Sequence, residues 1–166
     1  MEKTAKFFKV SREQFLSACA GLPEADFDKA YDNIILPRRA TVGSAGYDFR
    51  TPIDFTLAPG ETIKIPTGIR ARISDGWVLM LCPRSGLGFK YRLQLNNTVG
   101  IIDSDYFGSD NEGHIMAKIT NCSNENKTLE LKAGDAFMQG IFLPFGITED
   151  DDATAERNGG FGSTSV

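Results

Sequence analysis

The chain has 166 residues, of which 41% are hydrophobic and 24% are charged, and this composition is typical of one soluble globular domain. The net charge of −4 argues against a general nucleic-acid-binding protein, and no apolar run is long enough to cross a membrane. The N-terminus shows no signal-peptide pattern, and the spacing of the cysteines argues against a disulfide framework or a zinc site. We therefore expect a cytoplasmic protein with reduced thiols at Cys19, Cys82 and Cys122.

The first part of the chain carries a helical pattern. Ser11 begins the sequence Ser-Arg-Glu-Gln, in which Gln14 stands at the position of a capping box. Apolar residues then follow at helical spacing over 15–19, and 26–31 predicts one or two further turns. Residues 11–33 are therefore interpreted as an inserted helical element. Its role is either to pack on the surface or to contact a partner or another subunit.

The rest of the chain is a series of short strand patterns separated by turn residues. Residues 76–81 are continuously apolar, as expected of a central strand, and His114 is expected on the surface of another strand. Roughly ten strands and no long helix predict an all-β sandwich or barrel of the jelly-roll type. The other expected strands lie at residues 6–10, 53–57, 62–65, 68–73, 114–119, 128–131 and 136–145.

The acidic run at residues 149–152 is typical of a solvated linker. It divides the chain into a β domain at residues 1–148 and a flexible C-terminal arm at residues 149–166.

Three segments combine glycine with side chains that suit a nucleotide. Arg84 and Arg157 can each bind phosphate oxygens through a planar guanidinium, and Ser85 with nearby backbone amides can bind further oxygens. Asp103 supplies a carboxylate where a strand ends, and Phe161 supplies an aromatic face near the end of the chain. The segments predict a triphosphate site with a water-activating base and a stacking residue. They lie at residues 83–88, 97–108 and 157–164.

Together with residues 45–49 and 134–139, these segments resemble the five ordered motifs of the trimeric dUTPases. The resemblance covers about residues 36–166, and five motifs in order are far more specific than any one alone. It implies a distorted jelly roll, a homotrimer with shared active sites, and Mg²⁺-dependent hydrolysis of dUTP to dUMP and pyrophosphate. That activity limits uracil incorporation into DNA and supplies dUMP for dTMP synthesis.

The resemblance also implies roles for individual residues. Asp103 matches the base that orients the attacking water, although strand alternation places Asp105 on the same face and does not separate the two. The hairpin 93–102 matches the segment that reads uracil, completed by the amide of Asn97. Tyr106 matches the residue that excludes a 2′-hydroxyl. The implied substrate-binding residues are Arg84, Ser85, Gly86, Asn97, Gly100, Ile102, Tyr106, Gln139, Arg157, Phe161, Gly162 and Ser163.

The metal and the arm complete the expected site. Asp48 matches the aspartate that meets Mg²⁺ through water, while the ion rests mainly on substrate phosphates. Phe161 matches the residue that stacks on uracil. The fifth motif is one residue shorter between Arg157 and Phe161 than is common in the family, which leaves open whether Arg157 reaches the γ-phosphate.

Two alternative functions stay open. A dCTP deaminase-like enzyme would share the fold, but it needs a glutamate near the base, and none lies between Ser85 and Gly108. The other alternative is a dUTPase-like trimer that senses nucleotide and regulates another protein, with the helical element as the contact.

Overall fold

Antiparallel strands make up most of the computed structural model, which describes residues 2–155 and 157. This part contains eleven strands, three α-helices and one 3-10 helix, so the prediction of an all-β fold is confirmed. One sheet has the order β1 (Ala5–Lys9), β5 (Thr62–Ile73), β9 (Ile115–Asn121), β7 (Leu93–Leu95). The second has the order β2 (Arg38–Arg39), β3 (Tyr47–Arg50), β11 (Ala136–Pro144), β6 (Trp77–Pro83), β8 (Gly100–Ile102). A small third sheet pairs β10 (Leu129–Leu131) with β4 (Phe55–Leu57).

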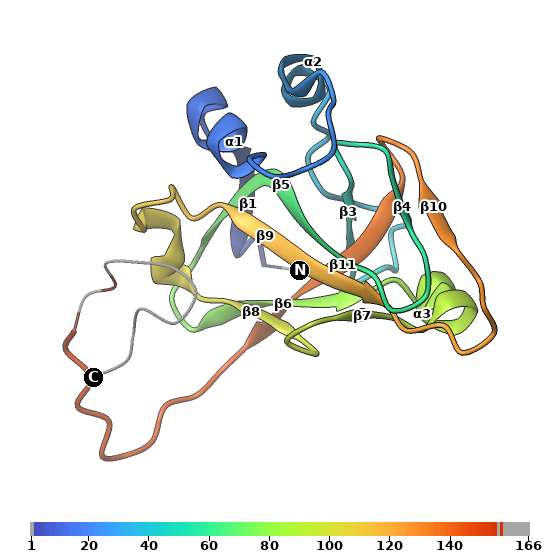
Figure 1. Ribbon diagram of the computed structural model, residues 1–166. Helices are drawn as coiled ribbons and strands as arrows, with labels where there is room; N and C mark the ends of the chain where they lie inside the picture. Colours follow the sequence, from blue (N-terminus) through green and yellow to red (C-terminus); the bar gives the residue numbers. More distant parts are fainter. Residues whose placement is uncertain (1, 156, 158–166) are drawn as a thin grey trace.

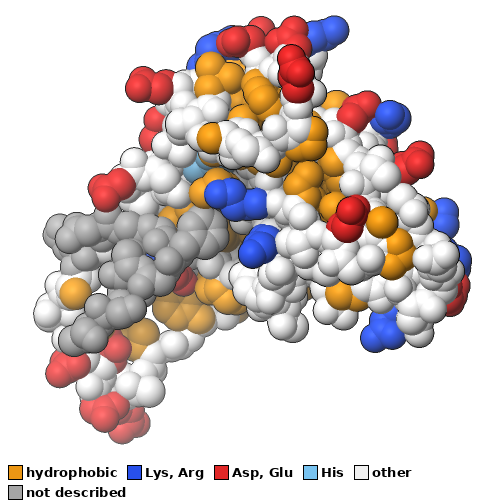
Figure 2. Space-filling model, in the orientation of Figure 1, with side chains coloured by type: hydrophobic (Ala, Val, Ile, Leu, Met, Phe, Trp, Pro, Cys, Tyr) orange, Lys and Arg blue, Asp and Glu red, His pale blue; other side chains and the backbone are white. Residues whose placement is uncertain are grey.

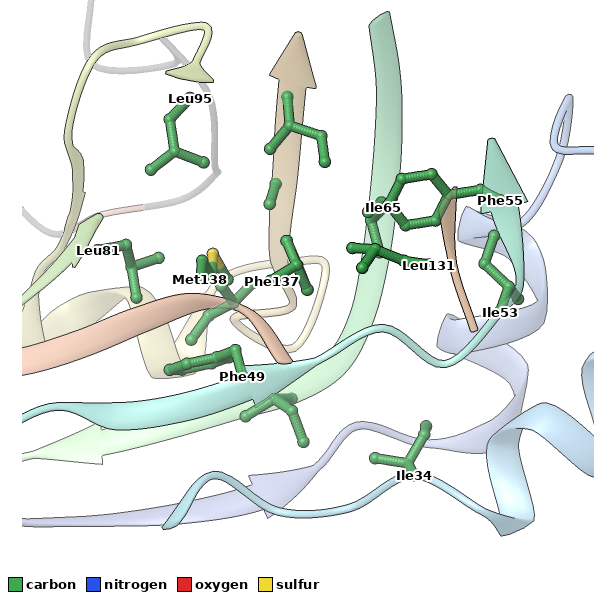
Figure 3. Packing of buried hydrophobic residues seen from close by; sticks show 14 of the residues in the cluster. Ile34, Phe49, Ile53, Phe55, Ile65, Leu81, Leu95, Leu131, Phe137 and Met138 are labelled. Atoms are coloured by element: carbon green, nitrogen blue, oxygen red, sulfur yellow. The ribbon is translucent and has the colours of Figure 1, made fainter. Parts of the chain in front are cut away.

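The core lies where the inward faces of these sheets meet. Phe49 of β3, Leu81 of β6 and both Phe137 and Met138 of β11 point toward one another, and all four are buried (Figure 3). Gly140 allows this close approach, because a Cβ atom there would lie 2.8 Å from Leu79 Cδ1 and 2.9 Å from the Phe49 ring. The core therefore fixes β11 between β3 and β6. Strand β3 carries Asp48, and Arg84 follows directly after β6.

One predicted boundary is wrong. The two strands expected at 62–65 and 68–73 form the single strand β5, with a bulge between Pro66 and Ile69 where the register against β9 shifts. Gly68 adopts a φ of +70° in this bulge, and the Thr67 hydroxyl donates to the Ile115 carbonyl at 2.6 Å. The proline and glycine thus mark a bulge within a strand instead of a turn between two strands.

The helical element predicted near the N-terminus is present as α1 (Arg12–Ala18) and α2 (Phe27–Asp32). Both helices lie at one end of the molecule, beside β1 and β5 (Figure 1). Ser11 is the N-cap of α1, and its hydroxyl accepts a hydrogen bond from the Gln14 amide at 3.1 Å. Phe15 is fully buried and its ring centre lies 6.4 Å from that of His114.

The expectation that His114 lies on a sheet surface is wrong. The side chain is fully buried beside Phe15 of α1, and its Nε2 accepts a hydrogen bond from the Gly68 amide at 2.9 Å. Burial lowers the pKa of His114 to about 4, against smaller opposing effects from Glu112. The alternating pattern of β9 does not predict this burial, because the side chain is covered by helix α1, which lies about 100 residues away in sequence.

The buried histidine should make folding stability depend on pH. Its pKa is about 4 in the folded chain and 6.5 when unperturbed, so the unfolded state binds the proton first as pH falls. The contribution of neutral His114 to the free energy of unfolding is fully present above the pKa of the unfolded state. It should fall by about 3 kcal/mol as the pH drops to the pKa of the folded state.

His114→Gln removes this titration, and its amide oxygen can still accept from the Gly68 amide. Denaturant unfolding at constant protein concentration measures the free energy of unfolding at about pH 7 and about pH 4.5. We expect the original chain to lose more stability than the variant over this interval. Equal losses would contradict the assignment to His114.

Candidate active site

A cavity of about 500 Å³ opens between residues 93–102, the 3-10 helix η1 (Ser104–Gly108) and strand β9. The predicted hairpin 93–102 is a chain reversal closed by an isolated bridge between Leu95 and Thr98, because β7 pairs in the first sheet and β8 in the second; we keep the name hairpin for this segment. The walls of the cavity also include Met116 and Lys118 of β9. Neither residue stands out in the sequence, since each belongs to an ordinary alternating strand, and only the cross-strand neighbourhood of the hairpin brings them to the cavity. Five residues expected at the site line it: Asn97, Gly100, Ile102, Tyr106 and Arg157.

The hairpin separates the roles of its two asparagines. The Asn96 amide donates to the Lys118 carbonyl at 2.9 Å, and its side-chain oxygen accepts from the Thr120 hydroxyl at 2.8 Å. Asn96 therefore holds the hairpin against β9. The side chain of Asn97 has no hydrogen bond within the described residues and lines the cavity, so its donor and acceptor stay available there.

Asp103 lies directly after β8 and before η1. Its Oδ2 pairs with Nη2 of Arg157 at 2.5 Å, while Nε of the same arginine lies 2.9 Å from Asp105 Oδ1. Both carboxylates predicted on one face therefore meet a single guanidinium, whose central carbon is 5.8 Å from the centre of the Tyr106 ring. Asp103 and Asp105 keep about half of their side-chain surface exposed, at 46% and 54%, which leaves room for water beside them.

Tyr106 is held rigidly in the wall of the cavity. Only 5% of its surface is exposed, and its hydroxyl donates to the His114 carbonyl at 2.9 Å. The same hydroxyl accepts from Asn111 Nδ2 at 2.8 Å. Burial raises the pKa of the Tyr106 phenol, so the hydroxyl stays protonated and able to donate.

The residues expected to bind phosphate form a second group. Arg84 follows β6, and Ser85 and Gly86 open helix α3 (Ser85–Tyr91), a helix that the sequence pattern did not reveal. Arg84 Nε lies 3.3 Å from Asp48 Oδ1, and Asp48 pairs with Gln139 across β3 and β11. A Cβ atom at Gly46 would lie 2.6 Å from Gln139 Oε1, so this glycine permits the close approach of the first and fourth motif segments.

The two groups lie at opposite ends of β6. Ile102 pairs with Leu79, which places Asp103 opposite residue 78, whereas Arg84 lies six residues further along the strand. At about 3.3 Å per residue, this separates Asp103 from Arg84 by roughly 20 Å. One chain thus gathers the cavity residues together and the phosphate residues together, but it does not bring the two groups into contact.

Three expected residues, Phe161, Gly162 and Ser163, lie outside the described residues. After β11 the chain leaves the sheet and continues away from it as a long loop (Figure 1). Acidic side chains gather where this segment turns, as Figure 2 shows. In the described part of the chain, three or more metal-ligating His, Cys, Asp or Glu side chains do not come together, and no helix is both long and apolar enough to span a membrane.

Comparisons with known proteins show the family of the chain. The dUTPase family model matches residues 32–165. The deoxyuridine 5′-triphosphate nucleotidohydrolase of Lactococcus lactis is 42% identical over 136 residues, a match that covers 80% of this chain and 89% of that protein. The enzyme of the same name from Escherichia coli O45:K1 is 43% identical, with 76% and 85% covered.

Solved structures give the same result. The dUTPase of Streptococcus mutans superposes with a TM-score of 0.63 at 39% identity, covering 71% of this chain and 91% of that one. A mutant dUTPase of Staphylococcus bacteriophage 80alpha, solved with dUpNHpp, gives a TM-score of 0.66 at 19% identity and supports the fold alone. These likenesses confirm the predicted jelly-roll type of fold. The chain belongs to the dUTPase family.

Proposed function

We propose that this protein hydrolyses dUTP to dUMP and pyrophosphate, with Asp103 as the general base for water that attacks the α-phosphorus. The observation that carries the proposal is the cavity of a dUTPase-family chain whose wall includes Asn97, Tyr106 and Arg157, the arginine that pairs with Asp103. Its volume of about 500 Å³ suits a nucleoside. The reaction would limit uracil incorporation into DNA and supply dUMP, and its substrate pool and the free cysteines fit the cytoplasm.

Base and sugar selection follow from the cavity wall. The free Asn97 amide and the backbone of the hairpin offer fixed donors and acceptors to uracil. Cytosine would present a donor where uracil presents an acceptor, which leaves a buried group unpaired at a cost of about 1–3 kcal/mol. Tyr106 is held by two hydrogen bonds and does not yield, so a ribose 2′-hydroxyl would meet its ring.

Arg157 links the base to the phosphates. Its guanidinium is shared between Asp103 and Asp105. Triphosphate oxygens compete for the same fork of N–H donors, because arginine binds phosphate in the same bidentate way as carboxylate. We propose that entry of the triphosphate draws Arg157 from Asp103, which frees the carboxylate to accept a proton from water.

Magnesium fits the donor set when phosphate supplies most of its ligands. Asp48 is one carboxylate already paired with Arg84, which suits contact with the ion through water. Mg²⁺ bound to the triphosphate offsets the negative charge that develops on the phosphate oxygens during the reaction. Arg84, Ser85, Gly86 and Gln139 would hold those oxygens in place.

We further propose a homotrimer with shared active sites. Roughly 20 Å of β6 separates Asp103 from Arg84 within one chain, which supports a second chain as the source of the phosphate-binding residues for each Asp103. A closed ring of three equal chains meets this need with one repeated interface. In the single chain Arg157 lies on Asp103 of its own chain, whereas the family resemblance implies an arm from another subunit.

The two alternatives have less support. A deaminase would need a glutamate at the base, and none lines the cavity among the described residues. A regulatory trimer would retain the same site, and the helices α1 and α2 would be its contact surface.

Substrate choice tests the proposed function directly. With Mg²⁺, we expect release of pyrophosphate from dUTP and far slower release from UTP, dCTP and dTTP, because Tyr106 and Asn97 select sugar and base. Pyrophosphate and ammonia are measured for each nucleotide. Ammonia from dCTP would support the deaminase instead, and equal rates for UTP and dUTP would refute the role of Tyr106.

Asp103→Asn keeps the shape of the side chain and removes the base. We expect turnover of dUTP to fall by about 10²–10⁴-fold while dUTP still binds. Asp105→Asn is the matched control, since Asp105 contacts the same guanidinium, and it should retain most of the activity. The reverse ranking of the two variants would move the base to Asp105.

Mixed assembly tests the shared site. Two inactive chains are co-expressed, one with Asp103→Asn and one truncated before Arg157. When the base and the arm come from different subunits, random mixing restores about a quarter of the sites. If trimers are shown to be mixed and are still fully inactive, the base and the arm of each site come from one chain. The contact of Arg157 with Asp103 within one chain is an arrangement of that kind.

A further inference from the structure

We infer that Glu112 is a positioning residue for Tyr106 and that it couples the N-terminal helical element to the nucleotide cavity. Glu112 lies in the loop between η1 and β9, 101 residues from its partner Ser11. The inference rests on the proposed role of Tyr106 in excluding a 2′-hydroxyl. It gives a function in the reaction to a loop and a helical element that the five motifs do not include.

Both carboxylate oxygens of Glu112 bind the start of α1. Oε2 accepts from the Ser11 backbone amide at 2.7 Å, and Oε1 accepts from the Ser11 hydroxyl at 2.5 Å. The same hydroxyl accepts from the Gln14 amide, and Glu112 makes the contact with the Ser11 backbone amide that the capping-box pattern assigns to the Gln14 side chain. These hydrogen bonds lower the pKa of Glu112, which keeps it ionised at neutral pH.

Arg70 of β5 joins this pair to η1. Its Nη2 donates to the Phe107 carbonyl at 2.6 Å, and its guanidinium lies 3.7 Å from the centre of the Phe107 ring. Nη1 of the same side chain lies 3.8 Å from Glu112 Oε2. Arg70 therefore holds the residue next to Tyr106 and the residue that binds α1 in one arrangement.

The neighbours of Glu112 set the position of Tyr106 directly. Asn111 donates from Nδ2 to the Tyr106 hydroxyl at 2.8 Å, and its Oδ1 accepts from the Gly113 amide at 3.2 Å. Gly113 lies so close to η1 that a Cβ atom there would be 2.6 Å from the Tyr106 carbonyl oxygen. A displacement of this loop therefore affects Tyr106 at two points: its hydroxyl, through Asn111, and its backbone, through Gly113.

Glu112 itself adopts a φ of +59°, a left-handed conformation that residues with a side chain rarely occupy. Such a conformation persists when the surroundings hold it. The Glu112 amide donates to the Ser109 carbonyl at 2.7 Å, and the side chain is held by Ser11 and Arg70. Loss of the side-chain contacts removes part of this support and lets the loop relax toward a commoner backbone conformation. Tyr106 then gains room to move, and the cavity admits a ribose more readily.

Glu112→Gln tests this inference, because the neutral amide loses the charge-assisted part of the contacts with Ser11 and the ion pair with Arg70. We expect the ratio of kcat/KM for dUTP to kcat/KM for UTP to fall about three- to thirtyfold. Ser11→Ala should lower the ratio in the same direction. Because both substitutions break the same contact, the ratio in the double variant should fall by less than the product of the two decreases seen in the single variants.

Asp26→Ala is the matched control. Asp26 caps α2 in the same helical element through a 3.0 Å hydrogen bond from the Lys29 amide, and it does not touch the loop. It should lower the melting temperature as an N-cap loss does and leave the dUTP-to-UTP ratio unchanged. All rates are measured well below the melting temperature of each variant.

The outcomes separate this inference from the proposed function. No preference for dUTP in the original chain would refute the role of Tyr106. A strong preference that survives intact in both Glu112→Gln and Ser11→Ala would overturn the positioning role alone. An equal fall of the ratio in Asp26→Ala would also overturn it, because the effect would then follow general destabilisation.

Discussion

The pairing of β6 with β8 on one side and with β11 on the other determines where Asp103, Arg84 and Gln139 lie. The register of Leu79 with Ile102 carries Asp103 to one end of β6, and the register of Cys82 with Gln139 carries the phosphate residues to the other. A one-residue slip would turn the side chains of β8 to the opposite face of the sheet. Burial of Leu79, Leu81 and Met138 opposes such a slip, so the core and the site have the same physical basis.

In the proposed function, one chain supplies the groups for base and sugar, and Asp103 needs phosphate-binding residues from elsewhere. The cavity holds Asn97 and Tyr106, while Arg84 pairs with Asp48 at the other end of β6 from Asp103. Assembly is therefore tied to catalysis in the proposed trimer, because subunits that separate lose the phosphate contacts at each Asp103. Arg157 contacts both Asp103 and Asp105, and carboxylates bind a guanidinium in the same bidentate way as phosphate oxygens.

The sequence predicts the strands and the family well for physical reasons. Alternation at β9 and β10 reports burial on one face, and glycine at positions such as Gly46 and Gly140 reports close backbone approach. It fails where the deciding contact is long-range. The burial of His114 depends on cover from α1, and the bulge at Gly68 depends on pairing with β9. The sequence does not predict helix α3, because glycine at positions 86 and 88 is more typical of a loop than of a helix.

Glu112 shows the same limit at the level of function. The family match begins at residue 32, so Ser11 lies outside it while Glu112 and Tyr106 lie within. The carboxylate that completes the cap of α1 belongs to Glu112, in the loop between η1 and β9, and a local sequence pattern does not predict a partner at such a distance. A residue of the nucleotide cavity is thus braced by a segment that the family match does not include. Selectivity in this chain then depends on how the N-terminal helices pack, as well as on the residues that touch the nucleotide.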